Sequence, residues 1–229
     1  NPMPRRAVLS DEQRMALLAL PDDETTLVQH WTLSEDDLAI IVRRRRPHNR
    51  LGFAIQLCAL RYPGRLLRPG ELIPDTPLAF VAEQLQIAPE VLADYATRGP
   101  TRYEQLDALR EGFGFTQFSR PLRAALQEWL LPIALTTTSG AGLARSLLGE
   151  CRRRRIIVPG ISSVERMVAQ ALLDAERHVA EHLTRGLETG QRRLLDALLL
   201  PHAGTNLSGL GWVRQPPGKP GRKTFAVII

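Results

Sequence analysis

Cysteine is scarce in this chain of 229 residues, which contains only Cys58 and Cys151. Two cysteines do not form the disulfide scaffold of a small secreted domain, and they lack the paired spacing of a structural zinc site. No run of about 18 apolar residues is present, which argues against a membrane-spanning helix. The first six residues also lack the apolar stretch of a signal peptide. These absences favour a reduced, cytoplasmic setting without a membrane partner.

Lysine is nearly absent as well. Of the 30 basic residues only Lys219 and Lys223 are lysines, so 28 are arginines. Codon bias in a GC-rich genome explains such a ratio. Recognition of phosphate or bases explains it too, because the planar guanidinium forms paired hydrogen bonds that an ammonium group cannot form. Composition does not choose between these explanations.

The positions of the charges are more informative than the net charge of +6. Residues 5–37 contain three arginines and eight acids, so their net charge is −5. Residues 38–70 contain eight arginines and no acid, so their net charge is +8. Clustered basic residues are typical of a surface that binds a polyanion. We therefore expect a basic patch formed by residues 38–70.

The chain has helical patterns almost throughout, and residues 156–158 form its only strong internal β-like run. Ser10 with Gln13 has the spacing of a capping box, and Ser34 precedes three acids that suit a helix N-terminus. The predicted fold is all-α, with helix-turn-helix-like elements and a long helix from Ser162 or Ser163. We expect an N-terminal helical module over residues 1–98, a second module over 99–201, and an irregular Gly/Pro-rich extension over 202–229.

The first arginine run is predicted to form the last turn of a helix that carries Leu38 and Ile41. A tight turn at residues 47–49 and a second helix from Arg50 would follow, which is a helix-turn-helix layout. Arginine reads guanine and asparagine reads adenine in a major groove. The alternative is structural, because arginines near a helix C-terminus are favoured by the helix dipole alone.

These considerations give a set of candidate DNA-binding residues. The first run would contact phosphates, the residues after Pro47 would position the DNA or read bases, three further arginines would extend the patch, and a second run would form another contact region. In that order the candidates are Arg43, Arg44, Arg45, Arg46, His48, Asn49, Arg50, Arg61, Arg65, Arg68, Arg152, Arg153, Arg154 and Arg155.

No catalytic set is recognisable. His178 and His182 have the spacing of a helical metal pair, but no third ligand is evident. The small polar loop 136–142 lacks the Gly-Lys-Ser/Thr ending of a nucleotide-binding loop. We therefore expect a binding module that is not itself an enzyme, without a metal ion, a cofactor or a small-molecule substrate.

Several segments resemble the N-terminal region of Tn3-family transposases. The most specific are residues 48–58, HNRLGFAIQLC, and residues 60–65, LRYPGR. Weaker matches follow the family order at residues 9–13, 30–38, 114–115, 154–159 and 212–219. The resemblance therefore covers about residues 9 to 219. After residue 220 the chain departs from the family pattern and ends in an apolar tail, as a truncation or a change of reading frame would produce.

The resemblance implies that this region binds the terminal inverted repeats of a transposon as double-stranded DNA during DNA transposition. In the family, DNA cutting belongs to a later domain with an Asp-Asp-Glu metal site, so no catalytic residue is carried over to this chain. A homodimer of the full transposase and a bacterial cytoplasmic location, at the nucleoid when DNA is bound, are implied as well. The alternative is an assembly module, in which the long helix and the apolar tail pack on the catalytic domain or on a second copy.

Overall fold

The computed structural model describes residues 8–95, 99–201, 204 and 207–214. These residues form eleven α-helices and one 3₁₀ helix, and their only β contacts are two isolated bridges, which confirms the all-α prediction. The helices are α1 (Asp11–Leu17), α2 (Glu24–Trp31), α3 (Glu35–Ile41), α4 (Pro47–Arg61), α5 (Asp75–Leu85), η1 (Pro89–Asp94), α6 (Gly99–Phe113), α7 (Arg120–Ala134), α8 (Gly140–Arg153), α9 (Ile161–Thr184), α10 (Thr189–Ala197) and α11 (Gly209–Val213).

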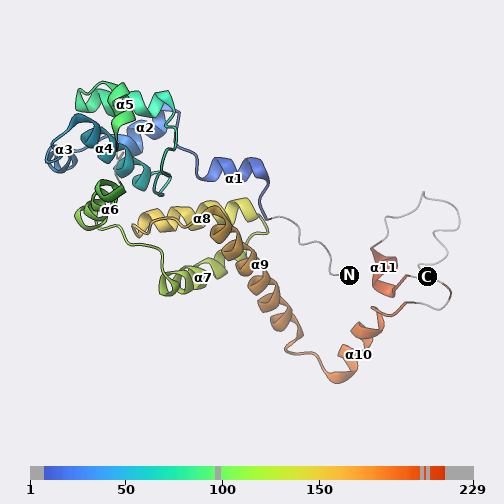
Figure 1. Ribbon diagram of the computed structural model, residues 1–229. Helices are drawn as coiled ribbons and strands as arrows, with labels where there is room; N and C mark the ends of the chain where they lie inside the picture. The colour runs from blue at the N-terminus through green and yellow to red at the C-terminus, as the bar shows by residue number, and fades with distance from the viewer. Residues whose placement is uncertain (1–7, 96–98, 202–203, 205–206, 215–229) are drawn as a thin grey trace. The chain divides into compact units, whose positions relative to one another are not determined.

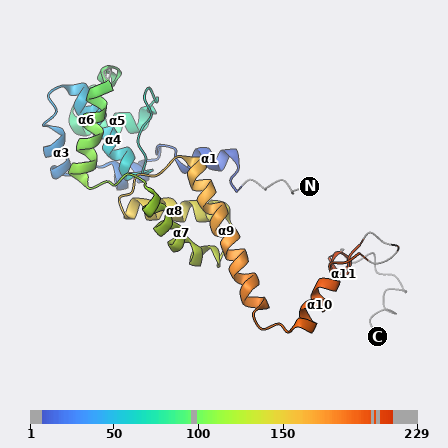
Figure 2. The same cartoon turned by 60° about the horizontal axis from the view of Figure 1, so that its bottom comes forward.

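The chain divides into a first unit, residues 1–177, and a second unit, residues 178–229. The first unit contains two hydrophobic cores. Helices α2 to α6 surround the first core, and α1, α7, α8 and α9 surround the second (Figure 1). The same two groups of helices are recognisable after rotation (Figure 2).

Helix α4 is the centre of the first core. Every residue from Leu51 to Leu60 is buried, because α2, α3, α5, η1 and α6 all pack against it. Trp31 of α2 is fully buried beside α4, and its indole Nε1 donates a hydrogen bond to the carbonyl of Tyr62 at 2.9 Å. Gly52 allows close packing, since a Cβ at this position would overlap the ring of Tyr95. A helix apolar on every face is expected in the middle of a bundle.

The second core is built on two amphipathic helices, α8 and α9. In α9 the buried residues follow helical spacing at Val164, Met167, Val168, Ala171 and Ala175. Helix α1 packs against α8, and the Arg14 guanidinium on α1 lies 2.6 Å from the Glu165 carboxylate on α9. Thus α1 contributes to the second core, although we expected residues 1–98 to form one module.

The short β-like run of residues 156–158 connects the two cores. Ile156 and Val158 are buried in the second core, whereas Ile157 is buried in the first. This alternation is the two-residue period of an extended chain. The backbone is held by a parallel bridge between Thr116 and Ile156 and by the Val158 N–H, which donates to the carbonyl of Gly64 at 2.8 Å.

The second unit contains the end of α9 from His178 onward, together with α10 and α11. We expected an irregular extension from residue 202, but Gly209–Val213 forms α11, which Ser208 caps by accepting a hydrogen bond from the Gly211 N–H. The predicted apolar tail lies outside the described residues. Among the described residues, no helix is both long and apolar enough to cross a membrane. The module boundaries at residues 98 and 201 stay a prediction.

Candidate nucleic-acid interface

The first arginine run forms a turn, not the end of a helix. Helix α3 ends at Ile41 and α4 already begins at Pro47, so residues 42–46 connect them and are called the arginine turn below. The prediction of a turn at residues 47–49 was therefore wrong. The physical reason lies in proline, which disfavours the helical conformation of the preceding residue yet fits the first position of a helix. Arg46 accordingly has an extended backbone and Pro47 starts α4.

This arrangement limits how α4 can meet DNA. A recognition helix needs an exposed face that enters the groove. The buried stretch of α4 runs from Leu51 to Leu60, so only its first turn, residues 47–50, and its last residue, Arg61, are partly or fully exposed. The expected layout, with the second helix lying along a groove, does not fit a helix buried on all sides. Contact through this element is restricted to the arginine turn and the first turn of α4.

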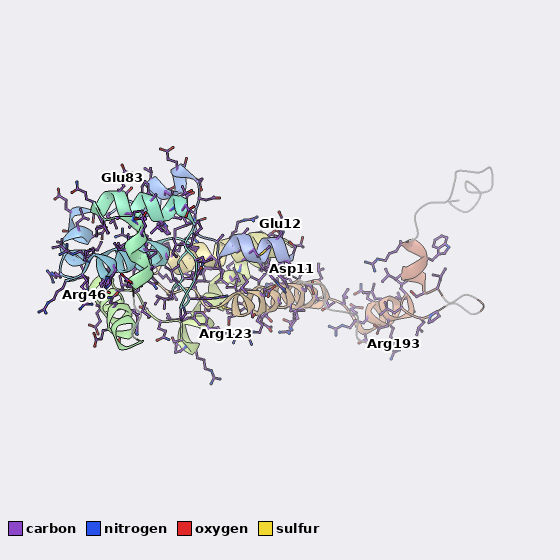
Figure 3. All side chains as sticks on the ribbon, turned by 45° about the horizontal axis from the view of Figure 1, so that its top comes forward. Asp11, Glu12, Arg46, Glu83, Arg123 and Arg193 are labelled. Atoms are coloured by element: carbon purple, nitrogen blue, oxygen red, sulfur yellow. The ribbon has the colours of Figure 1, made fainter. Side chains whose placement is uncertain are left out.

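Two arginines stiffen the arginine turn. The Arg44 guanidinium lies 4.3 Å from the centroid of the Phe53 ring, a cation–π contact. The Arg50 Nε donates a hydrogen bond to the Arg44 carbonyl at 2.7 Å. Arg43, Arg45 and Arg46 remain exposed, and none of their side chains bonds to another described residue. Figure 3 shows Arg46 projecting away from the surrounding helices.

Two arginines of the acid-free stretch are neutralised by acids just outside it. Arg61 lies 2.6 Å from the carboxylate of Asp37, whose side chain is only 4% exposed. Arg65 forms two hydrogen bonds to Glu71, at 2.9 and 2.5 Å, and its Nε donates to the Leu18 carbonyl at 2.7 Å. Both arginines therefore hold the fold together. The side chain of Arg68 is exposed and carries no such pair.

The second run is partly neutralised as well. Glu150 is buried on α8, and both its oxygens accept hydrogen bonds from Arg153 at 2.7 Å. The Arg154 Nε donates to the same carboxylate at 2.6 Å. Arg153 nevertheless keeps a side chain that is 69% exposed. Sequence reasoning missed Asp37, Glu71 and Glu150, and only Glu150 had a readable signal, its helical spacing of three and four residues from two arginines.

The other two members of the run lack acid partners among the described residues. Arg152 donates to the Pro63 carbonyl at 3.3 Å and lies 4.9 Å from the centroid of the Tyr62 ring. Arg155 donates to the Phe113 carbonyl at 2.8 Å. The structure thus brings Arg61, Arg152 and Arg155 together and keeps the arginine turn separate.

His48 and Asn49 lie half-buried in the first turn of α4.

The acid–arginine pairs predict a fall in stability at acidic pH. Hydrogen bonds from Arg153 lower the pKa of Glu150 to about 2, against the opposing effect of burial, and a hydrogen bond from Arg65 lowers the pKa of Glu71. Burial raises the pKa of Asp37, but hydrogen bonds from Arg61 and Ser34 outweigh it, so the net shift is downward. A depressed carboxyl pKa stabilises the folded state above the ordinary pKa near 4, and this contribution is lost as the pH falls.

We expect the urea-derived free energy of unfolding to fall as the pH is lowered from about 5 toward 2 at constant ionic strength. Glu150→Gln should make this dependence shallower, because the amide does not titrate. Glu128→Gln on α7 is the matched control, since Glu128 is exposed and forms no ion pair with a described residue. An equal pH dependence in wild type and Glu150→Gln would contradict the assignment.

No group of three or more His, Cys, Asp or Glu side chains in the described part of the chain could hold a metal ion. His178 and His182 are exposed on α9. Cys58 and Cys151 are buried, and burial raises their thiol pKa values to about 12 and about 11. Neutral, buried thiols are poor nucleophiles. The predicted absence of a metal ion and a cofactor stays a prediction.

Comparison with known proteins places these features in a family. Residues 8–171 match the family model described as "Domain of unknown function (DUF4158)". The chain belongs to this family. The matched range contains the arginine turn and the second arginine run. The chain also resembles the transposase of transposon Tn21 from Escherichia coli, with 41% identity over 218 residues, covering 95% of this chain and 22% of that protein.

Two further relatives show the same pattern. The transposase of transposon Tn501 from Pseudomonas aeruginosa is 38% identical over 218 residues, covering 95% of this chain and 22% of the relative. The transposase of transposon Tn1546 from Enterococcus faecium is 33% identical over 226 residues, covering 98% and 23%. The resemblance to the N-terminal part of Tn3-family transposases is thereby confirmed. The chain spans about a fifth of the length of these relatives.

Proposed function

We propose that this chain binds double-stranded DNA at the terminal inverted repeats of a transposon and acts in transposition as the N-terminal part of a Tn3-like transposase. The observation that carries the proposal is the arginine turn. Arg43, Arg45 and Arg46 are exposed there without acid partners among the described residues, on a turn that Arg44 and Arg50 hold in place. Exposed guanidinium groups on a fixed backbone are suited to contact DNA phosphates.

The start of α4 adds a second attraction for phosphate. No side chain caps this helix and its first turn contains no acid, whereas Asp23 and Ser34 cap α2 and α3. Pro47 has no N–H group, and the N–H groups of Asn49 and Arg50 donate to the Arg46 carbonyl, so this helix start attracts an anion mainly through the partial positive charge of the helix dipole. His48 and Asn49 lie in this turn, where their side chains would position the DNA or read base edges.

The family membership supports DNA as the polyanion, because the relatives are named as transposases. The other arginines of the candidate set divide into three groups under this proposal. Arg68 extends the exposed basic surface, whereas Arg61, Arg65, Arg153 and Arg154 act mainly through their acid partners. Arg152 and Arg155 have no acid partner among the described residues. A homodimer of the longer transposase would present two such surfaces to two transposon ends.

Fluorescence anisotropy with labelled duplexes tests the proposal. We expect the chain to bind its cognate inverted repeat more tightly than a scrambled duplex of equal length. The logarithm of the binding constant should fall with the logarithm of the salt concentration, with a slope of about −0.9 for each phosphate contact. Equal affinity for the two duplexes would refute sequence-specific recognition, and affinity independent of salt would refute the phosphate contacts.

A second candidate function, an assembly module, is favoured by the exposed apolar residues of the second unit. Several large apolar side chains are exposed on and around α10 and α11, namely Leu194, Leu195, Leu198, Leu199, Leu200, Trp212 and Val213. Such a surface is typical of protein interaction sites. Under this alternative the chain packs on the catalytic domain of the transposase or dimerises without reading DNA. Measurement of the mass with and without DNA separates the two, because a stable dimer without DNA affinity favours the assembly module.

A further inference from the structure

The two cores of the first unit meet at a cavity of about 200 Å³ that three arginines line. The first core supplies the end of α4 and the aromatic residues at and after the end of α6. The second supplies the last residues of α8 and its C-terminal turn. The lining residues are Leu60, Arg61, Phe113, Phe115, Arg152 and Arg155, and this space is called the arginine-lined cavity below.

Arg152 lies in this cavity without a compensating acid. Its guanidinium lies against the Tyr62 ring and donates to the Pro63 carbonyl, but no carboxylate of the described residues forms an ion pair with it. Burial lowers the pKa of Arg152. The pKa of His30 is lowered chiefly by burial of its own ring and, to a lesser extent, by the positive charge of Arg152. A partly buried charge without a counter-charge is unfavourable, and an anion in the cavity would relieve it.

Arg155 reaches the cavity through an unusual backbone. Its φ is +52°, in the left-handed region that residues other than glycine seldom adopt. The surrounding structure holds this conformation, since the Arg155 carbonyl accepts a hydrogen bond from the Thr116 N–H at 2.8 Å and its side chain donates to Phe113. Arg155 directly follows the C-cap of α8, and a left-handed residue commonly ends a helix at this position, here with the Ile156 N–H donating to the Cys151 carbonyl at 2.8 Å. Arg155 also lacks an ion-pair partner among the described residues.

The charge in the cavity is therefore unbalanced. Three arginines line the cavity, and of these only Arg61 is paired with a carboxylate, that of Asp37, which does not itself line the cavity. Leu60, Phe113 and Phe115 supply apolar walls, and partial exclusion of water strengthens the interaction between an anion and these arginines. Guanidinium groups match the oxygen atoms of a phosphate in pairs.

We propose that the arginine-lined cavity binds a phosphate group and that Arg152 and Arg155 are its principal ligands. This site is separate from the arginine turn, and the proposal goes beyond the function proposed above. Because the cavity is lined from both cores, a bound phosphate would join them. The phosphate is either one of the DNA backbone or a free phosphate compound. The buried Phe53 ring lies beside Arg44 of the arginine turn and beside Phe113 of the cavity, so it lies between the two arginine sites.

NMR spectroscopy of the arginine Nε–Hε groups in the whole chain tests the site. Inorganic phosphate and pyrophosphate are titrated against the wild type at constant ionic strength, with chloride as the reference anion. We expect saturable shifts of the Arg152 and Arg155 signals with phosphate and not with chloride. Shifts that are the same with both anions, or that do not saturate, would overturn the proposal without any variant.

Variants then assign the binding to Arg155. Arg155→Gln should weaken phosphate binding by about tenfold, the effect expected from losing a charge-assisted hydrogen bond, and Arg155→Lys should retain part of it. Arg145→Gln is the matched control, because Arg145 is exposed on α8, forms no ion pair with a described residue and does not line the cavity. Equal losses in Arg155→Gln and Arg145→Gln would overturn the assignment.

Competition identifies the source of the phosphate. If the cognate duplex displaces inorganic phosphate and Arg155→Gln also weakens DNA binding, the ligand is a DNA phosphate. If phosphate binds but the duplex does not displace it, the ligand is a free phosphate compound. Both results support the site. Failure of the function proposed above would appear separately, as DNA affinity that does not depend on the arginine turn.

Discussion

Replacing Arg43, Arg45 and Arg46 together by alanine is expected to weaken binding of the transposon-end duplex by about a hundredfold at physiological salt. The three guanidinium groups are exposed and form no bonds to the described residues, so each is free to contact a phosphate. In a plot of the logarithm of the binding constant against the logarithm of the salt concentration, each lost phosphate contact should make the negative slope shallower by about 0.9. The triple variant should therefore make it shallower by about 2.7. Anisotropy measured over a salt series gives both quantities.

A second triple variant controls for net charge. Arg120, Arg123 and Arg145 are also exposed and without ion-pair partners among the described residues, but they lie on α7 and α8. Figure 3 shows Arg123 on the surface, away from Arg46. Alanine at these three positions removes the same charge and should change affinity by much less than the first triple variant does. Equal losses of DNA affinity in the two triple variants would mean that affinity depends on the net charge of the chain, and that the arginine turn is not the interface.

The stability of the first triple variant should match that of the wild type, because exposed side chains without partners contribute little to folding. Arg44 and Arg50 are left in place for this reason. Arg44 packs on Phe53 and Arg50 bonds to its carbonyl, so their removal would alter the shape of the turn as well as its charge. An unchanged free energy of unfolding in urea keeps the effect on DNA separate from an effect on folding.

Local signals in the sequence predicted the helix starts well. The capping box at Ser10 forms as expected, Ser34 begins a helix with three acids in its first turn, and α1 and α3 start directly after these two serines. The capping box that Ser34 forms with Asp37 was not predicted. Pro47 was read as the end of a helix, whereas it is the first residue of α4. Proline is compatible with both positions, in a turn after one helix and at the start of the next. Which of them it occupies depends on how residues 51–60 pack against five other helices. Local propensity and residue spacing do not predict those long-range contacts.

The candidate site was less predictable because charge pairs form across long distances in sequence. Residues 38–70 contain no acid, yet Asp37 and Glu71, which flank this stretch, neutralise two of its arginines. The Arg14–Glu165 pair joins residues 151 positions apart. A count along the chain therefore overestimates the free charge of the patch. It also does not reveal the arginine-lined cavity, whose lining combines α4, the region after α6, and the end of α8.

Trp31→Ala is expected to lower the free energy of unfolding of the first core by about 3–5 kcal/mol. Trp31 is fully buried, and the substitution removes a large apolar side chain and leaves a cavity beside α4. It also leaves the Tyr62 carbonyl without its indole donor. Trp31→Phe should cost less than alanine, because it keeps an aromatic ring but still loses the hydrogen bond. Urea denaturation followed by circular dichroism at 222 nm measures these changes.

Trp212→Ala is the matched control, since Trp212 on α11 is 63% exposed and should change the free energy of unfolding by less than about 0.5 kcal/mol. The consequence of Trp31→Ala for DNA binding follows from the position of the residue. Trp31 packs against α4 and is fully buried, so its side chain cannot itself contact DNA. DNA affinity should therefore fall only in proportion to the unfolded fraction and recover at lower temperature, when the first core is folded again. A loss of DNA affinity that persists in fully folded Trp31→Ala would mean that the packing of the first core also determines the conformation of the arginine turn.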